Sequence, residues 1–525
     1  MSKKRNILFI MADQLRADYL GCNGHPTIQT PNIDKLAHNG VNFTKAYCQA
    51  PVCGPSRMSF YTGRYAFSHG ASYNNVPLNI SEKSLGEYLR PLGYRVGLVG
   101  KTHMKRDDEG MSRLGINPES SRGVLLSQCG FEPFERDDGL HQDQSVNPDL
   151  GYNQYLRENG FEGDNPWHEW ANSAEDDNGE VLSGWHMRNC HLPARVPEEH
   201  SETAYTTNRA IDFITEAADQ PWCLHLSYIK PHWPYIAPAP YHNMYSADDI
   251  LPAVKSEAER DNPHPVIAAF MNHSEGVIFS REETRKRVIP AYMGLITQLD
   301  DHIGRLMQFL EQKGILDDTT IVLTADHGDY LGDHWLGEKE LFHEPSVRIP
   351  LIICDPSQHA DETRGQTNDE LIESIDLVPT FIELAGGKVA SHILEGRSLL
   401  PQIQSKEKPE NWREFVVSEA DYAWRGARTE LGLEPDQTRA FMVRNHRWKY
   451  IHFEHFRPQL FDLQSDPQEL NDLGNHPDYE EIRTELAQAV YDWFRHRKTR
   501  TTISNEDVAS RTGKAQSKGY LFGVW

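Results

Sequence analysis

One short stretch of the chain places a cysteine just before a proline and an arginine. The stretch, residues 50–60, reads APVCGPSRMSF. Pro55 is typical of the first turn of a helix, so we expect Cys53 at or just before the N-terminus of a helix over 55–63. Free amide groups and the helix dipole favour an anion there, and Arg57 can lie on the same face as Cys53. The side chain at position 53 is therefore either a reactive thiolate in an anion-binding pocket or a buried structural thiol.

Polar side chains follow four of the predicted strands. These strands are expected over 6–11, 95–100, 223–229 and 320–325. The side chains after them, in chain order, are Asp13 and Gln14, Lys101 and His103, Lys230 and His232, and Asp326 and His327. Ligands of open α/β sheets bind at the carboxyl ends of the strands. Four such endings therefore predict one site that is built from several loops.

Two sets of these side chains could do chemistry. The candidate metal ligands are Asp13, Gln14, Asp326 and His327. Carboxylate and amide oxygens suit Ca²⁺ or Mg²⁺, and an imidazole shifts the preference toward Mn²⁺ or another transition metal. The candidate cationic or proton-transfer groups are Lys101, His103, His232 and Lys339. Each residue alone could instead be a turn former, a helix cap or a surface cation, and only their combination favours a site.

The elements that must position these residues alternate in type along the first 400 residues. Apolar runs at the four strands and at 349–354 are separated by helical patterns, which predicts an α/β fold with a mostly parallel sheet. Several of these strands are apolar throughout, as is typical when helices cover both faces of a sheet. The helices are expected over 31–39, 203–217 and 291–314.

Residues 104–190 differ from this pattern. They are acidic, rich in Gly, Asn and Asp, and poor in long apolar runs. We interpret them as a loop-rich insertion within a catalytic domain over 1–400, and such loops commonly contact the substrate.

The pattern changes again after about residue 400. Antiparallel strands and a final helix are expected, in chain order, over 414–420, 439–453, 459–463 and 480–497. This predicts a smaller C-terminal α+β domain over 401–525 with an antiparallel sheet. Its last residues, YLFGVW (520–525), are apolar, and they either fray or serve as an oligomerisation tail that docks on a neighbouring subunit.

Composition excludes some partners. The 525 residues have a formal net charge of -24, which disfavours nucleic acid because its phosphates would be repelled. An anionic substrate therefore requires a local cluster of cations.

The first apolar run is too short for a signal peptide, and no stretch approaches the roughly 18 apolar residues of a membrane span. The seven cysteines are irregularly spaced without a CxxC pair, which is typical of reduced thiols in a cytoplasm.

With these residues described, the chain resembles the sulfatase family of the alkaline phosphatase superfamily. The run Cys53-Gly54-Pro55-Ser56-Arg57 matches the family's C-x-P-S-R motif, whose cysteine is oxidised after synthesis to formylglycine. Further segments match in the family's order: MADQLRADYLGCNG, TPNIDKLAHNGVNF, TGRY, GYRVGLVGKTH, KPHWPY, TADHGDYLGDHWLGEK, EPSVRIPLI and QLFDLQSDPQELNDL. The resemblance covers most of the chain and is weakest at 104–190 and in the final tail. It implies an alkaline-phosphatase-like fold, with a large mixed, mostly parallel sheet sandwiched by helices.

Two pairs of residues depart from the pattern of many sulfatases. Asp13-Gln14 stands where many members have two adjacent acids, and Asp326-His327 stands where many have Asp-Asn. Both pairs are similar to those of phosphonate monoester hydrolases, relatives that use the same formylglycine. The two basic residues after the strand 95–100 are instead similar to the sulfatase pattern. The resemblance therefore leaves open both the metal, Ca²⁺ or Mn²⁺, and the ester that is cleaved.

The resemblance also implies a mechanism. The aldehyde at position 53 hydrates to a gem-diol, and one metal-activated hydroxyl attacks sulfur or phosphorus in line. The second hydroxyl then loses its proton, and the aldehyde reforms as sulfate leaves. The implied metal ligands are Asp13, Gln14, the modified Cys53, Asp326 and His327. The other implied roles are diol binding for Arg57 and Lys101, proton acceptance for His103, proton donation to the leaving group for His232, and sulfuryl-oxygen contacts for Lys339, His232 and Asn74.

We therefore predict a sulfuric ester hydrolase of the arylsulfatase type, acting on small-molecule sulfate monoesters with one divalent metal. The alternative is a phosphonate monoester or phosphodiester hydrolase with the same site, and overlapping activities are expected. A non-catalytic binding protein on the same fold is disfavoured by the near-complete set of candidate residues. The expected partners are a formylglycine-generating enzyme during maturation and further copies of this chain, as a dimer or tetramer. No nucleic acid and no membrane partner is expected.

Overall fold

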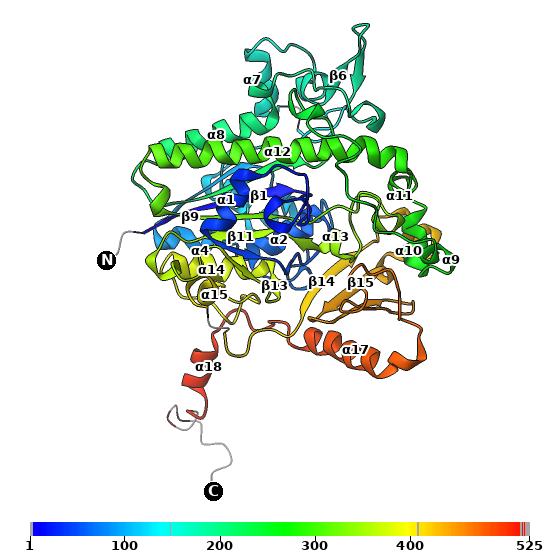
Figure 1. The fold of residues 1–525 in the computed structure, drawn as a ribbon. Coiled ribbons are helices and arrows are strands. Elements are labelled where there is room, and N and C mark those ends of the chain that lie inside the picture. Colours follow the sequence, from blue (N-terminus) through cyan, green and yellow to red (C-terminus); the bar gives the residue numbers. More distant parts are fainter. Residues whose placement is uncertain (1–3, 148, 407–408, 515–516, 518, 520–525) are drawn as a thin grey trace.

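An eight-stranded sheet forms the centre of the molecule (Figure 1). The structure is a computed structural model that describes residues 4–147, 149–406, 409–514, 517 and 519. The strands lie in the order β12 (Gln366–Asn368), β2 (Val41–Phe43), β11 (Leu351–Cys354), β9 (Thr319–Ala325), β1 (Asn6–Asp13), β8 (Trp222–Pro231), β4 (Arg95–Gly100) and β5 (Glu132–Arg136). All run in one direction except β11, which is antiparallel to both of its neighbours.

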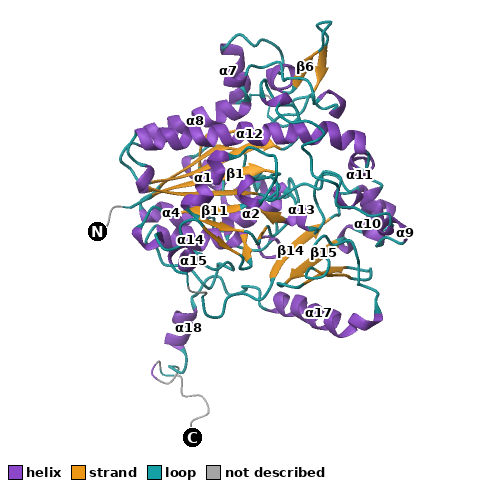
Figure 2. Cartoon of the chain, viewed as in Figure 1, coloured by secondary structure: helices purple, strands orange, loops and turns teal. Residues whose placement is uncertain are grey.

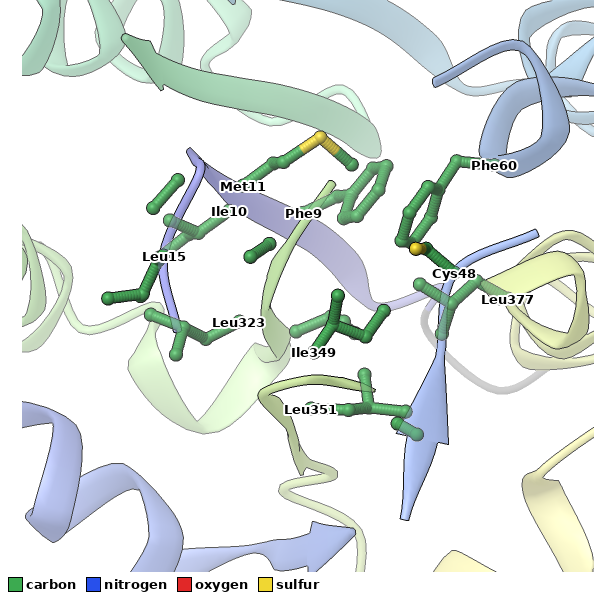
Figure 3. Packing of buried hydrophobic residues seen from close by; sticks show 14 of the residues in the cluster. Phe9, Ile10, Met11, Leu15, Cys48, Phe60, Leu323, Ile349, Leu351 and Leu377 are labelled. Carbon is green, nitrogen blue, oxygen red and sulfur yellow. The ribbon is translucent and has the colours of Figure 1, made fainter. Parts of the chain in front are cut away.

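Helices cover both faces of this sheet (Figure 2). One face packs against α1 (Pro31–Asn39), α8 (Glu202–Ala217) and α12 (Glu282–Gln312). The other is covered by α2 (Cys53–Thr62) and α14 (Leu377–Leu384), whose Phe60 and Phe381 contact Phe9 of β1, and by α4 (Leu85–Leu89), which packs on α14. Such covering explains why β1 is apolar on both faces, since its residues from Ile7 to Ala12 are all buried. On the α2 side, Phe9 packs against Phe60 with ring centroids 6.1 Å apart (Figure 3).

A second, four-stranded antiparallel sheet lies toward the C-terminus. Its strands are β14 (Val416–Asp421), β15 (Arg439–Arg444), β16 (Trp448–Phe453) and β17 (Gln459–Asp462). Helix α17 (Glu480–Arg495) packs on it, with Trp493 against Phe441 at 6.0 Å between ring centroids. A three-stranded sheet of β10 (Arg348–Ile349), β3 (Ala46–Tyr47) and β13 (Ile372–Glu373) joins the two larger sheets.

Residues 104–190 contain more regular structure than the predicted loop-rich insertion. Their elements are α5 (Asp108–Leu114), α6 (Ser121–Leu126), β5, α7 (Gly151–Glu158), β6 (Ser173–Glu175) and β7 (Val181–Ser183). Strand β5 is an edge strand of the main sheet. A separate cluster of buried residues that includes Leu140, Tyr152 and Trp167 forms beyond α8, where α7 and β6 lie (Figure 1). This core is made of scattered aromatic residues, so it was not predictable from long apolar runs in the sequence.

The remaining helices are short. They are α3 (Ala66–His69), α9 (Ala258–Asp261), α10 (Pro265–Met271), α11 (Ser274–Phe279), α13 (Glu344–Val347), α15 (Leu400–Gln404), α16 (Gly426–Glu430) and α18 (Asn505–Arg511). None of the helices in the described ranges is both long and apolar enough to cross a membrane.

The predicted fold class is confirmed, with differences in detail. The strand expected over 349–354 is divided at Pro350 into β10 and β11, because proline cannot donate a ladder hydrogen bond. The helix expected over 291–314 begins earlier, at Glu282. The division into domains at residue 400 stays a prediction, and the apolar end 520–525 lies outside the described residues.

Candidate active site

The carboxyl ends of β9, β1, β8 and β4 lie side by side at one edge of the sheet, opposite the N-terminus of α2. Asp13 is the last residue of β1, and Cys53 is the first residue of α2. The Cys53 Sγ atom lies 3.7 Å from Asp13 Oδ1 and 3.1 Å from Nε2 of His327, which follows β9. Parallel strand order, which no single motif encodes, therefore brings these distant residues together.

Four buried side chains form a cluster that could bind a metal ion. One ligand atom from each of Asp13, Cys53, Asp326 and His327 lies within 4.8 Å of the others. The His327 ring is oriented by Nδ1, which lies 2.9 Å from the Gly328 carbonyl oxygen, so that Nε2 faces the cluster. Two carboxylates and an imidazole are hard or borderline donors, which fit Ca²⁺ or Mn²⁺.

Arg57 connects this cluster to the surrounding strands. Its fully buried guanidinium donates to Asp13 Oδ2 at 3.0 Å and to Asp326 Oδ2 at 2.8 Å. It also donates to the Lys101 carbonyl oxygen at 2.8 Å and to Ser227 Oγ at 2.7 Å. A planar guanidinium with several donors suits this bridging position better than a lysine would.

The electrostatics of the cluster favour negative charge at position 53. Burial alone would raise the pKa of the Cys53 thiol, but Lys339, Lys101 and His327 lower it well below the ordinary value. Burial would also raise the pKa of Asp13, yet the nearby cations hold that pKa well below its usual range, with Lys101 Nζ only 2.6 Å from Oδ2. The site therefore stabilises an anion despite the acidic net charge of the chain.

Gln14 lies at the edge of the cluster. Its backbone N–H donates to Asp326 Oδ1 at 3.1 Å, and its backbone adopts the left-handed region at φ 65°. The side-chain oxygen Oε1 accepts a hydrogen bond from Lys339 Nζ at 2.8 Å. The amide nitrogen donates to Asp329 and to Tyr235. Because Lys339 occupies its oxygen here, ligation of a metal by Gln14 stays a prediction.

Lys339 and His232 lie together beside the cluster. The Lys339 Nζ atom is 3.1 Å from His232 Nε2, which is 3.9 Å from Asp13 Oδ1. The His232 Nδ1 atom is 2.8 Å from the Trp233 carbonyl oxygen, so this nitrogen bears the proton. Burial and the adjacent Lys339 ammonium lower the pKa of His232 to about 3. His232 is thus neutral without a bound anion, and it needs one nearby before it can donate a proton.

Asn74 and His103 complete the predicted set. Asn74 Oδ1 accepts a hydrogen bond from the Gly54 N–H, at the start of α2, at 2.7 Å. The side-chain oxygen of Asn74 is thus occupied, and its NH₂ group remains available to the cavity that Asn74 lines. His103 has a left-handed φ of 53°, and its backbone N–H donates to Asp138 Oδ1 at 2.9 Å. Its Nδ1 is buried without a hydrogen-bond partner among the described residues. The His103 side chain also lies close enough to Cys53 to lower the pKa of the thiol by hydrogen bonding.

A cavity of about 630 Å³ opens from Cys53 toward solvent. Predicted site residues that line it are Cys53, Asn74, Lys101, His103, His232 and Lys339. One wall is aromatic: Trp233 packs on His232 with centroids 4.3 Å apart, and Trp185 packs on Trp233 at 5.1 Å. Trp185 and His141 come from the insertion, which therefore contributes to this cavity. Lys230 points elsewhere, because its Nζ donates to the Pro234 carbonyl oxygen at 2.8 Å.

Several supporting residues were not among the predicted ones. Ser227 binds Arg57, Asp329 binds Gln14, and Asp138 accepts the backbone N–H groups of Thr102 and His103. Ser227 is the one hydroxyl residue in the mostly apolar run CLHLS of β8, and this was a usable signal. Asp138 follows the unpredicted strand β5, so nothing in the sequence pointed to its position.

Comparisons with known proteins agree with this fold. A model of the family named Sulfatase matches residues 5–387, and one described as N-sulphoglucosamine sulphohydrolase, C-terminal matches residues 332–496. The chain is 32% identical over 516 residues to the Multifunctional alkaline phosphatase superfamily protein PehA of Trinickia caryophylli, covering 93% of this chain and 95% of that protein. It is 28% identical over 492 residues to an arylsulfatase of Clostridium perfringens, covering 91% and 92% respectively.

Solved structures show the same likeness. The phosphonate monoester hydrolase of Agrobacterium radiobacter superposes with a TM-score of 0.80 at 27% identity, covering 94% of this chain and 96% of the other. The phosphonate monoester hydrolase SpPMH of Silicibacter pomeroyi gives a TM-score of 0.82 at 27% identity, covering 96% and 98%. The fold and these similarities identify the chain as a hydrolase of the alkaline phosphatase superfamily that acts on ester bonds. Within that superfamily, the chain belongs to the sulfatase family.

Proposed function

We propose that this protein hydrolyses sulfuric esters of small alcohols or phenols, with formylglycine made from Cys53 and one divalent metal. The observation that supports this most is the position of Cys53. It is the first residue of α2, lies 3.1 Å from His327 Nε2, and shares its cluster with Asp13 and Asp326. The C-x-P-S-R motif thus lies where a nucleophile, a metal ion and Arg57 could meet.

The residues at the site fit both groups. The oxygen and nitrogen donors of Asp13, Asp326 and His327 suit Ca²⁺ or Mn²⁺, which when bound would supply Lewis-acid activation of the nucleophile. Formylglycine would supply a hydrated aldehyde whose oxygens take the place of the Cys53 Sγ atom. Hydrogen bonding by the His103 side chain is among the effects that lower the pKa of Cys53, so a hydroxyl group at position 53 would lie within its reach.

The residues around position 53 would have different roles in the reaction. Arg57 and Lys101 hold Asp13 ionised and orient the side chain at position 53. Lys339 Nζ and the amide donors of Asn74 face the cavity, where they would bind the sulfuryl oxygens and stabilise the charge that develops on them. His103 would accept the proton of the second hydroxyl group as sulfate is released.

His232 would donate a proton to the leaving oxygen. It is neutral beside Lys339, and a bound anion between the two groups would raise its pKa. His232→Ala should therefore lose more activity with esters of weakly acidic phenols than with 4-nitrophenyl sulfate. Equal losses on all leaving groups would contradict this role.

Phosphonate monoester hydrolysis is the second candidate. The pairs Asp13-Gln14 and Asp326-His327 support it, as do the solved relatives with TM-scores of 0.80 and 0.82. Both ester classes present a tetrahedral, singly charged centre, so overlap is expected. The test compares kcat/KM on an aryl sulfate and on the matching aryl phosphonate monoester, with Cys53→Ala as the inactive control. A preference for the phosphonate by several orders of magnitude would reverse the order of the two proposals.

Maturation and assembly stay part of the proposal. The seven free cysteines support a reducing compartment, which we take to be the cytoplasm, and a formylglycine-generating enzyme would act there on Cys53. Assembly into dimers or tetramers is a prediction from the apolar end 520–525, and light scattering on the full chain tests it.

A further inference from the structure

Glu338 places an unpaired carboxylate in the same cavity as Cys53. Three acidic side chains line this cavity within the described part of the chain: Asp138, Glu338 and Glu340. Two of them are neutralised, because Asp138 pairs with Arg136 and Glu340 pairs with Arg425 at 2.9 Å. Glu338 is half-buried and its side chain makes no hydrogen bond or ion pair to any described residue. Its charge is therefore free to act on whatever occupies the cavity.

Glu338 is also next to the cation that would bind the substrate. The Lys339 ammonium faces Gln14 Oε1 and His232 rather than Glu338, at 2.8 and 3.1 Å. The two backbones around it, at Glu338 and Glu340, adopt left-handed φ values of 56° and 90°, a conformation uncommon for residues other than glycine. The turn thus directs Lys339 to the cluster while Glu338 stays unpaired beside it.

The charge of the ligand changes during the proposed reaction. A sulfate monoester carries one negative charge, and adding water yields the alcohol, a proton and sulfate, which carries two. A phosphonate monoester also carries one charge, whereas a phosphate monoester carries nearly two above its second pKa of about 6. A fixed carboxylate beside the oxygen-binding lysine repels a dianion more strongly than a monoanion.

We propose that Glu338 is a specificity-determining residue that favours monoanionic esters over dianions and speeds the release of inorganic sulfate. The inference rests on the proposed function, because it assumes that the ester binds beside Lys339. A second negative charge on the ligand would face the Glu338 carboxylate across the cavity. At an effective dielectric constant of about 20, this repulsion weakens binding by roughly tenfold. Besides Lys339, the cavity wall has a second cation without an ion-pair partner among the described residues, Lys105, which is exposed and offsets this repulsion little because water screens it.

The experiment uses the matured, metal-loaded full chain at pH 8.5. Burial raises the pKa of Glu338 to about 7, against the opposing effect of Lys339 and with the acidic groups of Asp329, Glu275 and Glu340 nearby. The carboxylate is therefore ionised at that pH. The variants are Glu338→Gln, which removes the charge, and Glu338→Asp, which keeps it. Circular dichroism confirms that both are folded.

Two readouts test the inference. The first is the ratio of kcat/KM for an aryl phosphate to kcat/KM for the matching aryl sulfate. The second is the ratio of the Kd values of inorganic sulfate and methanesulfonate, measured by calorimetry, which needs no turnover. Glu338→Gln should raise the ratio of kcat/KM values about tenfold. It should also lower the Kd of sulfate about tenfold relative to the Kd of methanesulfonate. Glu338→Asp should match the wild type in both ratios. If both ratios stay within twofold of the wild type in Glu338→Gln, the inference is wrong. Wild-type protein that hydrolyses neither aryl ester would refute the proposed function instead, and the calorimetric ratio would still decide the role of Glu338.

Discussion

Replacing Arg57 by methionine should strongly destabilise the metal-free protein. The guanidinium is fully buried and donates four hydrogen bonds, to Asp13, Asp326, the Lys101 carbonyl oxygen and Ser227. Methionine keeps much of the side-chain volume. It leaves two buried carboxylates close together without the cation that bridges them.

The expected loss follows from this geometry. Removing one partner of a buried ion pair costs about 3–5 kcal/mol of unfolding free energy, because an uncompensated charge stays buried. Lys101 Nζ remains 2.6 Å from Asp13 Oδ2 and compensates one of the two carboxylates. We therefore expect a loss near the lower limit, about 3 kcal/mol.

Urea denaturation in the presence of a chelator measures this loss, with Arg495→Met as the matched control. Arg495 has a 60% exposed side chain and pairs with Asp492 at 3.2 Å on the surface of α17. Its loss should change the unfolding free energy by less than about 0.5 kcal/mol. If Arg57→Met costs less than about 1 kcal/mol, Arg57 does not hold the two carboxylates as described.

Three further predictions concern charge at and away from the site. Lys339→Met should lower kcat/KM on an aryl sulfate roughly 10²–10³-fold, because one oxygen-binding cation is lost, and a loss below tenfold would contradict that role. Asp326→Asn should lower the metal content of the purified protein, measured by mass spectrometry; full occupancy would place the metal elsewhere. Burial raises the pKa of Glu419 to about 8, so the folded protein binds more protons than the unfolded chain between about pH 5 and 8. Stability should fall as the pH rises through this range, by at most about 1.4 kcal/mol per pH unit, and Glu419→Gln should reduce that slope in urea denaturation. An unchanged slope would show that Glu419 is not its source.

The main sheet was predictable because its strands are covered on both faces. Helices on each side favour apolar residues on both faces, so β1, β8 and β9 stand out as mostly apolar runs. Strand β5 gave no such signal. Its sequence EPFER is half-buried, and the strand lies at the edge of the sheet. Asp138 owes its position to this edge strand, which it follows in the chain.

The site was predictable to the extent that its residues directly follow strands. Asp13 is the last residue of β1, and Lys101, His232 and Asp326 directly follow β4, β8 and β9. The parallel sheet then brings these four residues together. Which atoms contact one another was not predictable, since it depends on side-chain geometry between distant segments. That Gln14 accepts a hydrogen bond from Lys339 is such a case.

The most direct test of the account is the mass of the peptide that spans position 53, isolated from protein whose sulfatase activity has been measured. Conversion of Cys53 to formylglycine replaces one sulfur and two hydrogens by one oxygen. We predict that the modified peptide is present and that its fraction rises in proportion to specific activity among preparations. Fully active protein in which Cys53 is an unmodified thiol would contradict the central claim.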